Sequence, residues 1–204
     1  NSGSGIRHYE AKQGTLKNNI VLNHYGMHSS GLNFYEGCRD ILFENNYIQN
    51  VIAINRSVEN LTFRNNVVDS QNRNAVSVAM WRSGRVGGRH MKNITFENNT
   101  FVNVNMDRGW ARAIFVQSGA SAPEGLVARH NVLSKLSPPF PGTIENNIFL
   151  HETPETVSGS GGMVVSDPDV LFRDAANGDF RRKPGGPMME AGADVPPPPA
   201  EWLP

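Results

Sequence analysis

The chain has 204 residues, of which 38% are hydrophobic and 8% aromatic, which suits one domain with a thin core. Lysine and arginine equal aspartate and glutamate at 19 each, so the formal net charge is zero. The single cysteine, Cys38, excludes an internal disulfide, and no apolar run is long enough for a membrane-spanning helix. We expect neither a nucleic-acid partner nor a membrane partner.

The zero net charge conceals an asymmetry along the chain. Residues 1–150 hold 15 basic and 10 acidic side chains, whereas residues 151–204 hold 4 and 9. The basic excess is densest in residues 73–112, where seven Lys and Arg side chains accompany two acidic ones. Such an excess either attracts an acidic ligand or belongs to an ordinary solvated loop, and both interpretations stay open.

The first predicted strand begins at Ser4 and occurs twice. The run Ser4-Gly5-Ile6-Arg7-His8-Tyr9-Glu10 returns 26 residues later as Ser30-Gly31-Leu32-Asn33-Phe34-Tyr35-Glu36, with weaker copies at 51–56, 75–82 and 112–119. No capping helix precedes the first copy. We therefore expect the first coil to be exposed, or covered by a missing N-terminal segment or a neighbouring molecule.

A second repeat follows each of these strands. An apolar residue, a polar residue and usually an Asn-Asn pair recur at 16–20, 43–47, 63–67, 96–100, 128–132 and 144–148. Repeats of this size indicate a solenoid in which each coil buries its apolar side chains against its neighbours. Asparagine tolerates left-handed turns and can hydrogen-bond to an asparagine one coil away. We predict that Asn19, Asn46, Asn66, Asn99, Asn131 and Asn147 form one column.

These repeats resemble the right-handed parallel β-helix of the pectin-lyase-like superfamily, over about residues 4–150. The tail is similar to the closing segment of many bacterial β-helix proteins, in Asp167-Pro168, Phe172, Gly178-Asp179-Phe180-Arg181, Pro184, Pro187 and Ala191-Gly192. The predicted fold class is thus all-β. Residues 1–150 are expected to form the stacked coils, and residues 151–204 an irregular C-terminal closing segment with a Pro-rich tail.

The resemblance implies a bacterial protein that is secreted or periplasmic and holds a polysaccharide on its outer strands. In similar lyases, Lys or Arg side chains neutralise a uronate carboxylate and remove the adjacent proton, sometimes with calcium. We expect no cofactor here, although the resemblance leaves calcium open. A metal site at His24 and His28 is not expected, because these side chains lack acidic partners in sequence.

Strand alternation gives a candidate binding face. Taking the pairs Ile6/His8, Leu32/Phe34, Ile52/Ile54, Val76/Val78 and Ile114/Val116 as inward leaves Arg7, Tyr9, Asn33, Tyr35, Ala53, Asn55, Ser77, Ala79, Phe115 and Gln117 on the outside. Aromatic and polar side chains on neighbouring coils could bind sugars, and the alternative is an ordinary exposed sheet face. Glu10 and Glu36 are expected about 5 Å apart, on equivalent positions of adjacent coils.

Two long basic loops, Trp81–Lys92 and Asn103–Arg112, follow on adjacent coils, and we predict that their roots adjoin and their arginines converge. The predicted catalytic set is Arg85, Arg89, His90 and Lys92. The predicted substrate-binding set is Tyr9, Tyr35, Asn55, Arg56, Trp81, Arg82, Arg108, Trp110, Arg112 and Gln117. The favoured function is binding, and cleavage by β-elimination, of an acidic polysaccharide. A non-catalytic β-helix module (an adhesin, spike or accessory) and a glycoside hydrolase of the same fold are the alternatives.

Overall fold

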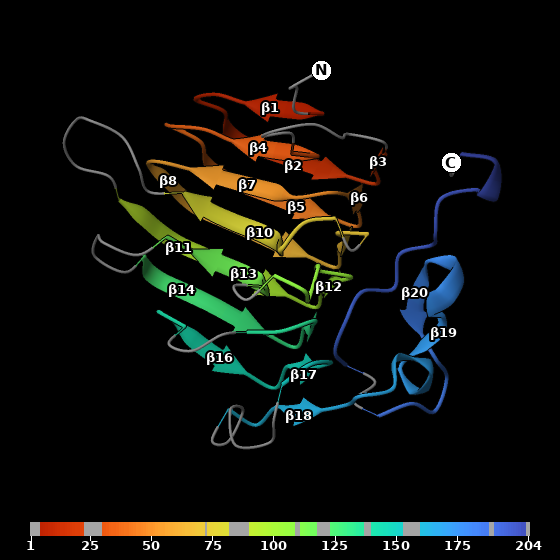
Figure 1. Ribbon diagram of the computed structural model, residues 1–204. Coiled ribbons are helices and arrows are strands. Elements are labelled where there is room, and N and C mark those ends of the chain that lie inside the picture. The colour runs from red at the N-terminus through yellow and green to blue at the C-terminus, as the bar shows by residue number, and fades with distance from the viewer. Residues whose placement is uncertain are drawn as a thin grey trace.

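The computed structural model describes residues 5–22, 30–71, 73–81, 90–108, 111–117, 123–136, 140–152, 160–187 and 190–202. Within these ranges the chain is all-β, apart from three short 3-10 turns in its last quarter, at Pro168–Val170, Ala175–Asn177 and Ala200–Trp202. The main body consists of parallel strands in three sheets (Figure 1).

In the first five coils each sheet receives one strand from each coil, and the described part of the chain after β15 adds strands only to the six- and seven-stranded sheets. The five-stranded sheet contains β1 (Ile6–His8), β4 (Leu32–Phe34), β7 (Ile52–Asn55), β10 (Val76–Trp81) and β13 (Arg112–Val116). The six-stranded sheet contains β2 (Lys12–Lys17), β5 (Arg39–Glu44), β8 (Val58–Arg64), β11 (Met91–Glu97), β14 (Glu124–Arg129) and β16 (Thr143–Glu145). The seven-stranded sheet contains β3 (Ile20–Val21), β6 (Tyr47–Gln49), β9 (Val67–Asp69), β12 (Thr100–Val102), β15 (Val132–Leu133), β17 (Ile148–Phe149) and β18 (Met163–Val164).

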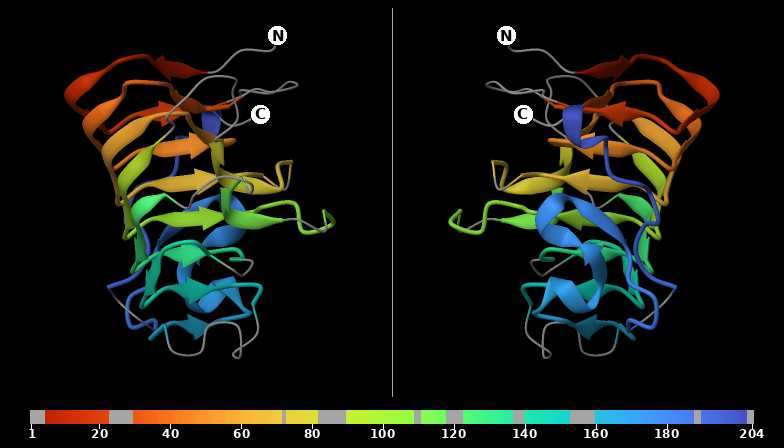
Figure 2. Two further views of the ribbon diagram at one scale, coloured as in Figure 1. Left: turned by 90° about the vertical axis from the view of Figure 1, so that its left-hand side faces the viewer. Right: turned by 90° about the vertical axis from the view of Figure 1, so that its right-hand side faces the viewer.

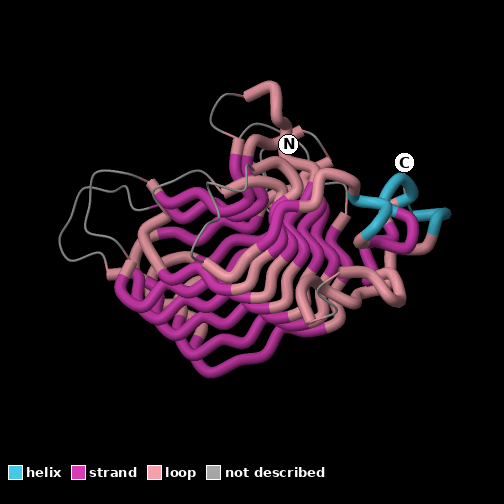
Figure 3. The backbone as a smooth tube through the Cα atoms, turned by 90° about the horizontal axis from the view of Figure 1, so that it is seen from below, coloured by secondary structure: helices cyan, strands magenta, loops and turns pink. Residues whose placement is uncertain are grey.

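From β1 to β15 the chain visits the three sheets in turn, and strands of the same sheet pair in parallel with strands of the next coil. Figures 2 and 3 show the resulting stack from the sides and from below. This arrangement is consistent with a parallel β-helix. The parallel pairing continues past residue 150, because β18 pairs with β17.

The predicted asparagine column is confirmed. Asn19, Asn46, Asn66, Asn99 and Asn131 each donate a hydrogen bond from Nδ2 to Oδ1 of the asparagine in the next coil, ending at Asn147, at 2.8–3.0 Å. The backbone N–H of each donor residue binds the same Oδ1 at 2.9–3.0 Å. We call this set the inner asparagine ladder. All but Asn19 are fully buried, so the ladder satisfies the backbone at a turn that water cannot reach.

The residue before each ladder asparagine adopts the left-handed conformation. Asn18, Asn45, Asn65, Asn98, His130 and Asn146 have φ between 50° and 58°, and we call them the outer turn column. Asparagine is the non-glycine residue that best tolerates this conformation, which explains why the Asn-Asn pair recurs. The structure thus gives the two asparagines of each pair different roles, one in the core and one at the surface.

The core is a continuous stack of side chains from the three inner sheet faces. It includes Phe34, Phe43, Phe63, Phe96 and Phe101, each with at most 1% of its surface exposed. Neighbouring rings lie 5.0–6.3 Å apart between centroids, in stacked or edge-to-face contact. These aromatic side chains therefore link three consecutive coils within one hydrophobic cluster.

The outer face of the six-stranded sheet carries a row of alternating charge. In register along the sheet, the row reads Lys17, Glu44, Arg64, Glu97, Arg129 and Glu145. Arg64 lies 2.6 Å from Glu44, and Arg129 forms a closer ion pair with Glu97 than Arg64 does. These cross-strand pairs are partly exposed, so each contributes at most about 1 kcal/mol.

The C-terminal segment covers the outer face of the seven-stranded sheet (Figure 1). The antiparallel pair β19 (Phe172–Asp174) and β20 (Asp179–Arg182) places Phe172 and Phe180 against Tyr47, Val67, Val102, Val132 and Ile148. Residues 190–199, which we call the strap, then run back toward the first coil. The strap binds the outer turn column through Gly192 N–H to His130 O and Asp194 N–H to Asn65 Oδ1.

Candidate functional site

Five predicted binding residues occupy the same position on five consecutive strands. They are Tyr9, Tyr35, Asn55, Trp81 and Gln117, and each directly follows an inward-facing residue of the register His8, Phe34, Ile54, Met80 and Val116. We call this set the strand-end row. Tyr9 is 59% exposed and Trp81 36%, and the other three are half-buried. The row runs along the axis of the stack and offers aromatic and amide groups to solvent.

Two tyrosines form the first part of the row. The rings of Tyr9 and Tyr35 stack with centroids 4.3 Å apart and planes 5° apart. Burial and the neighbouring Tyr9 raise the pKa of Tyr35, and the guanidinium groups of Arg7 and Arg56 oppose this shift. Each ring covers one face of the other, so the pair presents mainly its hydroxyl groups and the more exposed Tyr9 ring. These groups favour hydrogen bonds to a ligand over stacking on it.

Trp81 forms the other aromatic part of the row, together with two residues of β13. Its ring centroid lies 5.1 Å from that of Phe115, at an angle of 57°. The guanidinium carbon of Arg112 lies 5.5 Å from the centre of the Phe115 ring, within cation–π range. Phe115 contacts both the exposed indole and the guanidinium, so a ligand laid across Phe115 can reach both groups. Sequence alternation placed Phe115 on this face but did not identify it as a site residue.

Four of the other outward residues of the sheet are buried, contrary to our expectation, whereas Arg7 is exposed and Phe115 half-buried. Asn33, Ala53, Ser77 and Ala79 are 4%, 4%, 0% and 1% exposed. Ala79 packs with Val51, Val76 and Phe115, and Ser77 Oγ lies 3.0 Å from Ser70 Oγ. Alternation identifies the side of the sheet on which a side chain lies, but it does not tell whether other residues cover that side. Asn33 still contributes indirectly, because its Oδ1 accepts a hydrogen bond from Asn55.

The register of β10 also differs from the sequence alignment. Val78 and Met80, rather than Val76 and Val78, lie beside Ile52 and Ile54. A shift of two residues preserves the inward and outward faces, so the hydrophobic pattern alone could not detect it. The shift is what brings Trp81 beside Asn55 and into the strand-end row.

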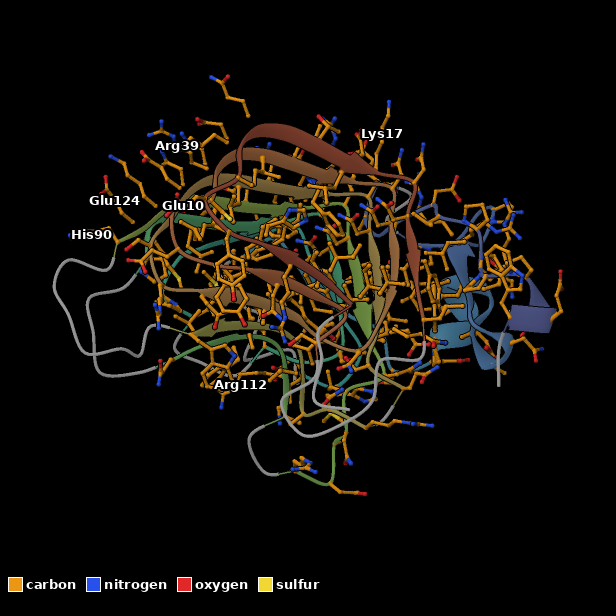
Figure 4. The ribbon with its side chains drawn as sticks, turned by 90° about the horizontal axis from the view of Figure 1, so that it is seen from above. Glu10, Lys17, Arg39, His90, Arg112 and Glu124 are labelled. Atoms are coloured by element: carbon orange, nitrogen blue, oxygen red, sulfur yellow. The ribbon has the colours of Figure 1, made fainter. Side chains whose placement is uncertain are left out.

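The roots of the two basic loops do not adjoin at the five-stranded sheet, contrary to our expectation. The convergence of their arginines stays a prediction, because Arg82, Arg85 and Arg89 lie outside the described residues. Trp81, where the first loop begins, pairs with Asn55 at the end of its strand, whereas Arg112, where the second loop ends, pairs with Val76 at the start of that strand. Five residues of extended strand separate these roots by about 16 Å. The first loop leaves the five-stranded sheet and the second enters it. In Figure 4, Arg112 accordingly lies apart from the corner shared by His90, Glu10 and Glu124.

The predicted catalytic set is only partly described. Arg85 and Arg89 lie outside the described residues, as do Arg82 and Trp110 of the binding set. His90 is exposed, and Lys92 belongs to the six-stranded sheet, where its Nζ lies 3.5 Å from a carboxylate oxygen of Glu124. Arg108 is exposed in the turn before β13. Thus Lys92 does not lie on the same sheet as the strand-end row.

Two glutamates lie near the strand-end row, and the carboxylate of one of them, Glu36, forms an ion pair. Glu10 and Glu36 occupy adjacent coils, and the backbone N–H of Glu10 donates to the carbonyl oxygen of Glu36 at 3.1 Å. The Glu36 side chain forms an ion pair of 3.3 Å with Arg56, another predicted binding residue. This pairing reduces the positive charge that Arg56 offers to a ligand. The described residues contain no group of three or more His, Cys, Asp and Glu side chains that could hold a metal ion.

Among the residues that the structure describes, no helix is long and apolar enough to span a membrane. Comparisons of the chain with protein-family models, with curated proteins and with solved structures found no match. The strand-end row and the residues around it are therefore the basis for a functional assignment.

Proposed function

We propose that the chain binds an acidic polysaccharide, laid along the axis of the stack over the strand-end row. The observation that carries the proposal is the alignment of Tyr9, Tyr35, Asn55, Trp81 and Gln117 on five consecutive strands. With neighbouring strands about 4.8 Å apart, the row is about 19 Å long. A linear polymer can contact such a row repeatedly, whereas a compact ligand would use only part of it.

Arginines beside both aromatic groups support an acidic ligand. Arg7 and Arg56 lie near the tyrosine pair, and Arg112 lies over Phe115 near Trp81. A guanidinium group binds a carboxylate through two parallel hydrogen bonds, which suits a uronate or another acidic sugar. Arg112 is the residue we test, because its guanidinium lies over Phe115, whose ring contacts the exposed Trp81.

We also propose the handedness of the coil and the superfamily to which the fold belongs. Parallel strands joined by crossover connections are almost always right-handed, so we assign a right-handed β-helix. The inner asparagine ladder supports the resemblance to the pectin-lyase-like superfamily. Membership would make this a secreted or periplasmic bacterial protein.

Cleavage by β-elimination is a second, separable part of the proposal. It needs a group that neutralises the uronate carboxylate and a base for the adjacent proton. Among the described residues of the predicted set, His90 is exposed but Lys92 is paired with Glu124. That ion pair favours the alternative, a non-catalytic binding module. Incubation with uronate polymers separates the two, because elimination creates an unsaturated product that absorbs ultraviolet light.

Binding is tested with uronate oligosaccharides of increasing length, by calorimetry at low and high salt. We expect affinity to rise with length until the ligand spans the row, and to fall as salt screens the arginines. Trp81→Ala and Arg112→Ala should each weaken binding by about fivefold or more, equivalent to about 1 kcal/mol.

Matched controls are Trp202→Ala and Arg173→Ala, which change exposed residues of the C-terminal segment. Neither control should alter affinity. Equal binding of neutral and acidic oligosaccharides by the wild type and both row variants would refute the proposed face, whatever the outcome of the product assay.

A further inference from the structure

A second site lies between the strap and the first three coils, on a different sheet from the strand-end row. The strap contacts three neighbouring members of the outer turn column. Gly192 N–H donates to His130 O at 2.8 Å, Asn98 Nδ2 donates to Glu190 O, and Asp194 N–H donates to Asn65 Oδ1 at 2.7 Å. The strap is therefore held by the side-chain amides of Asn98 and Asn65 and by the backbone carbonyl of His130.

This pattern stops before the column does. Two more members, Asn45 and Asn18, continue toward the first coil, and the strap residues that reach them include Pro196 and Pro197. Proline has no backbone N–H, so these residues cannot repeat the hydrogen bond that Asp194 makes to Asn65. The strap thus passes the last two coils without using their side-chain amides.

A pocket of about 320 Å³ occupies this position. Four asparagines, Asn18, Asn19, Asn45 and Asn65, line it together with Asp194, which is an exposed residue. Asn19 belongs to the inner asparagine ladder, and Asn65 binds both Asn45 and the strap. Ile20, which is 40% exposed, and the two prolines supply apolar walls. The volume lies at the lower end of the range for small-ligand sites, and the lining combines apolar surface with a few polar groups, as such sites do.

Asn18 and Asn45 keep unused hydrogen-bonding capacity. Asn45 Oδ1 accepts a bond of 2.6 Å from Asn65 Nδ2, but within the described ranges Asn45 Nδ2 donates to no protein atom. The Asn18 side chain makes no hydrogen bond to any described residue. A primary amide offers two N–H donors and a carbonyl acceptor, which match the carbonyl and N–H of a secondary amide.

We propose that this pocket binds a small ligand through an acetamido group. The acetamido carbonyl accepts from Asn45 Nδ2, its N–H donates to Asn18 Oδ1 or to the Asp194 carboxylate, and its methyl group contacts Ile20 and the prolines. In this site the amide of a ligand would bind side-chain amides of the outer turn column, as the strap backbone already binds those of Asn65 and Asn98. It does not depend on the function proposed for the strand-end row.

The test uses the full chain and three probes: N-acetylglucosamine, glucose, and N-acetylalanine methylamide. Binding is followed by NMR, through the side-chain amide signals of asparagine. We expect N-acetylglucosamine to shift the Asn18 and Asn45 signals with saturation, and glucose to leave them unchanged. Asn18→Gly and Asn45→Gly should each weaken binding about fivefold, as expected for the loss of one hydrogen bond.

Glycine is chosen because it accepts the left-handed conformation of these positions, so the variants lose the amide with little backbone strain. Asn146→Gly, at the other end of the outer turn column, is the matched control and should bind as the wild type does. Binding of the sugar but not the blocked amino acid identifies an acetamido sugar as the ligand class, and the reverse identifies an acetylated peptide. Absence of a saturable shift with both acetamido probes, or equal affinity for glucose, overturns the proposal.

Discussion

At the scale of single residues, the inner asparagine ladder makes the strongest prediction about stability. Asn66 accepts from the N–H and Nδ2 of Asn46 and donates to Phe43 O and Asn99 Oδ1, all at 2.9–3.0 Å and all buried. Asn66→Leu leaves several of these groups without partners, at about 1–3 kcal/mol for each buried polar group. We expect the free energy of unfolding to fall by about 3 kcal/mol or more, measured by urea titration.

Asn19→Leu provides the comparison. Asn19 ends the ladder, is only half-buried, and accepts no ladder bond from a further coil in the described part of the chain. Its loss should cost about 1 kcal/mol, because the groups it leaves can bind water. Similar losses for the two variants would show that burial of the ladder does not determine its contribution.

Because of His8, we predict that the free energy of unfolding falls as the pH is lowered. Burial lowers the pKa of His8, its ring stacks on Phe34 at 5.4 Å, and its buried Nε2 has no partner among the described residues. The folded state therefore binds a proton less readily than the unfolded state, whose histidine has a pKa near 6.5. The contribution of His8 to stability is present above about pH 6.5 and is lost as the pH falls below it.

The measurement compares urea midpoints at pH 7.5 and pH 5.0 for the wild type and His8→Phe. The variant keeps an aromatic ring beside Phe34 and should lose less stability in acid than the wild type. His151, whose pKa is lowered by burial and then by Lys135, retains a similar dependence in both proteins. An unchanged acid response in the variant would assign the effect to other groups.

At the scale of elements, the seating of the strap depends on Gly192. Its φ of 79° is left-handed, and a Cβ there would lie 2.8 Å from Cγ2 of Val132 and 3.2 Å from Oγ1 of Thr100. Gly192→Ala therefore adds a steric clash to the backbone cost, and we expect a loss of about 2–4 kcal/mol, measured by thermal and urea unfolding.

Gly185→Ala separates the two contributions. Gly185 has nearly the same φ, 75°, but nothing lies within 4 Å of the Cβ that would be added. This variant should show only the backbone cost of about 1–2 kcal/mol. Equal losses at both positions would mean that the strap does not approach the sheet closely at Val132.

The elements that the sequence predicted best are those that repeat. The Asn-Asn pairs located the turns, and alternation separated inward from outward residues in the five-stranded sheet. The two-residue shift of β10 escaped prediction because it leaves every side chain on the same face. The opposite placement of Trp81 and Arg112 escaped because spacing along the chain does not tell which end of a strand a loop joins.

At the scale of the molecule, the strap joins coils that are far apart in sequence. Asp194 binds Asn65, which lies 129 residues earlier, and Ala193 binds Thr100, which lies 93 residues earlier. In a solenoid each coil otherwise contacts only its neighbours, so its ends can open independently. Deletion of residues 190–204 should speed hydrogen exchange in β3 and β6 more than in β11, which lies in a central coil of the stack. Uniform acceleration in all three strands would indicate loss of global stability instead.

The alternating charges on the six-stranded sheet help to determine which coils pair with each other during folding. The inner asparagine ladder is nearly identical in every coil, so it cannot distinguish the correct neighbour from the next one along. The charge row can, because a coil that skipped its neighbour would place Glu44 beside Glu97, or Arg64 beside Arg129. Like charges directly opposite one another are destabilising. The charge row thus disfavours any pairing that skips an odd number of coils, because such a pairing places like charges side by side. The repeats alone would not distinguish these pairings from the correct one.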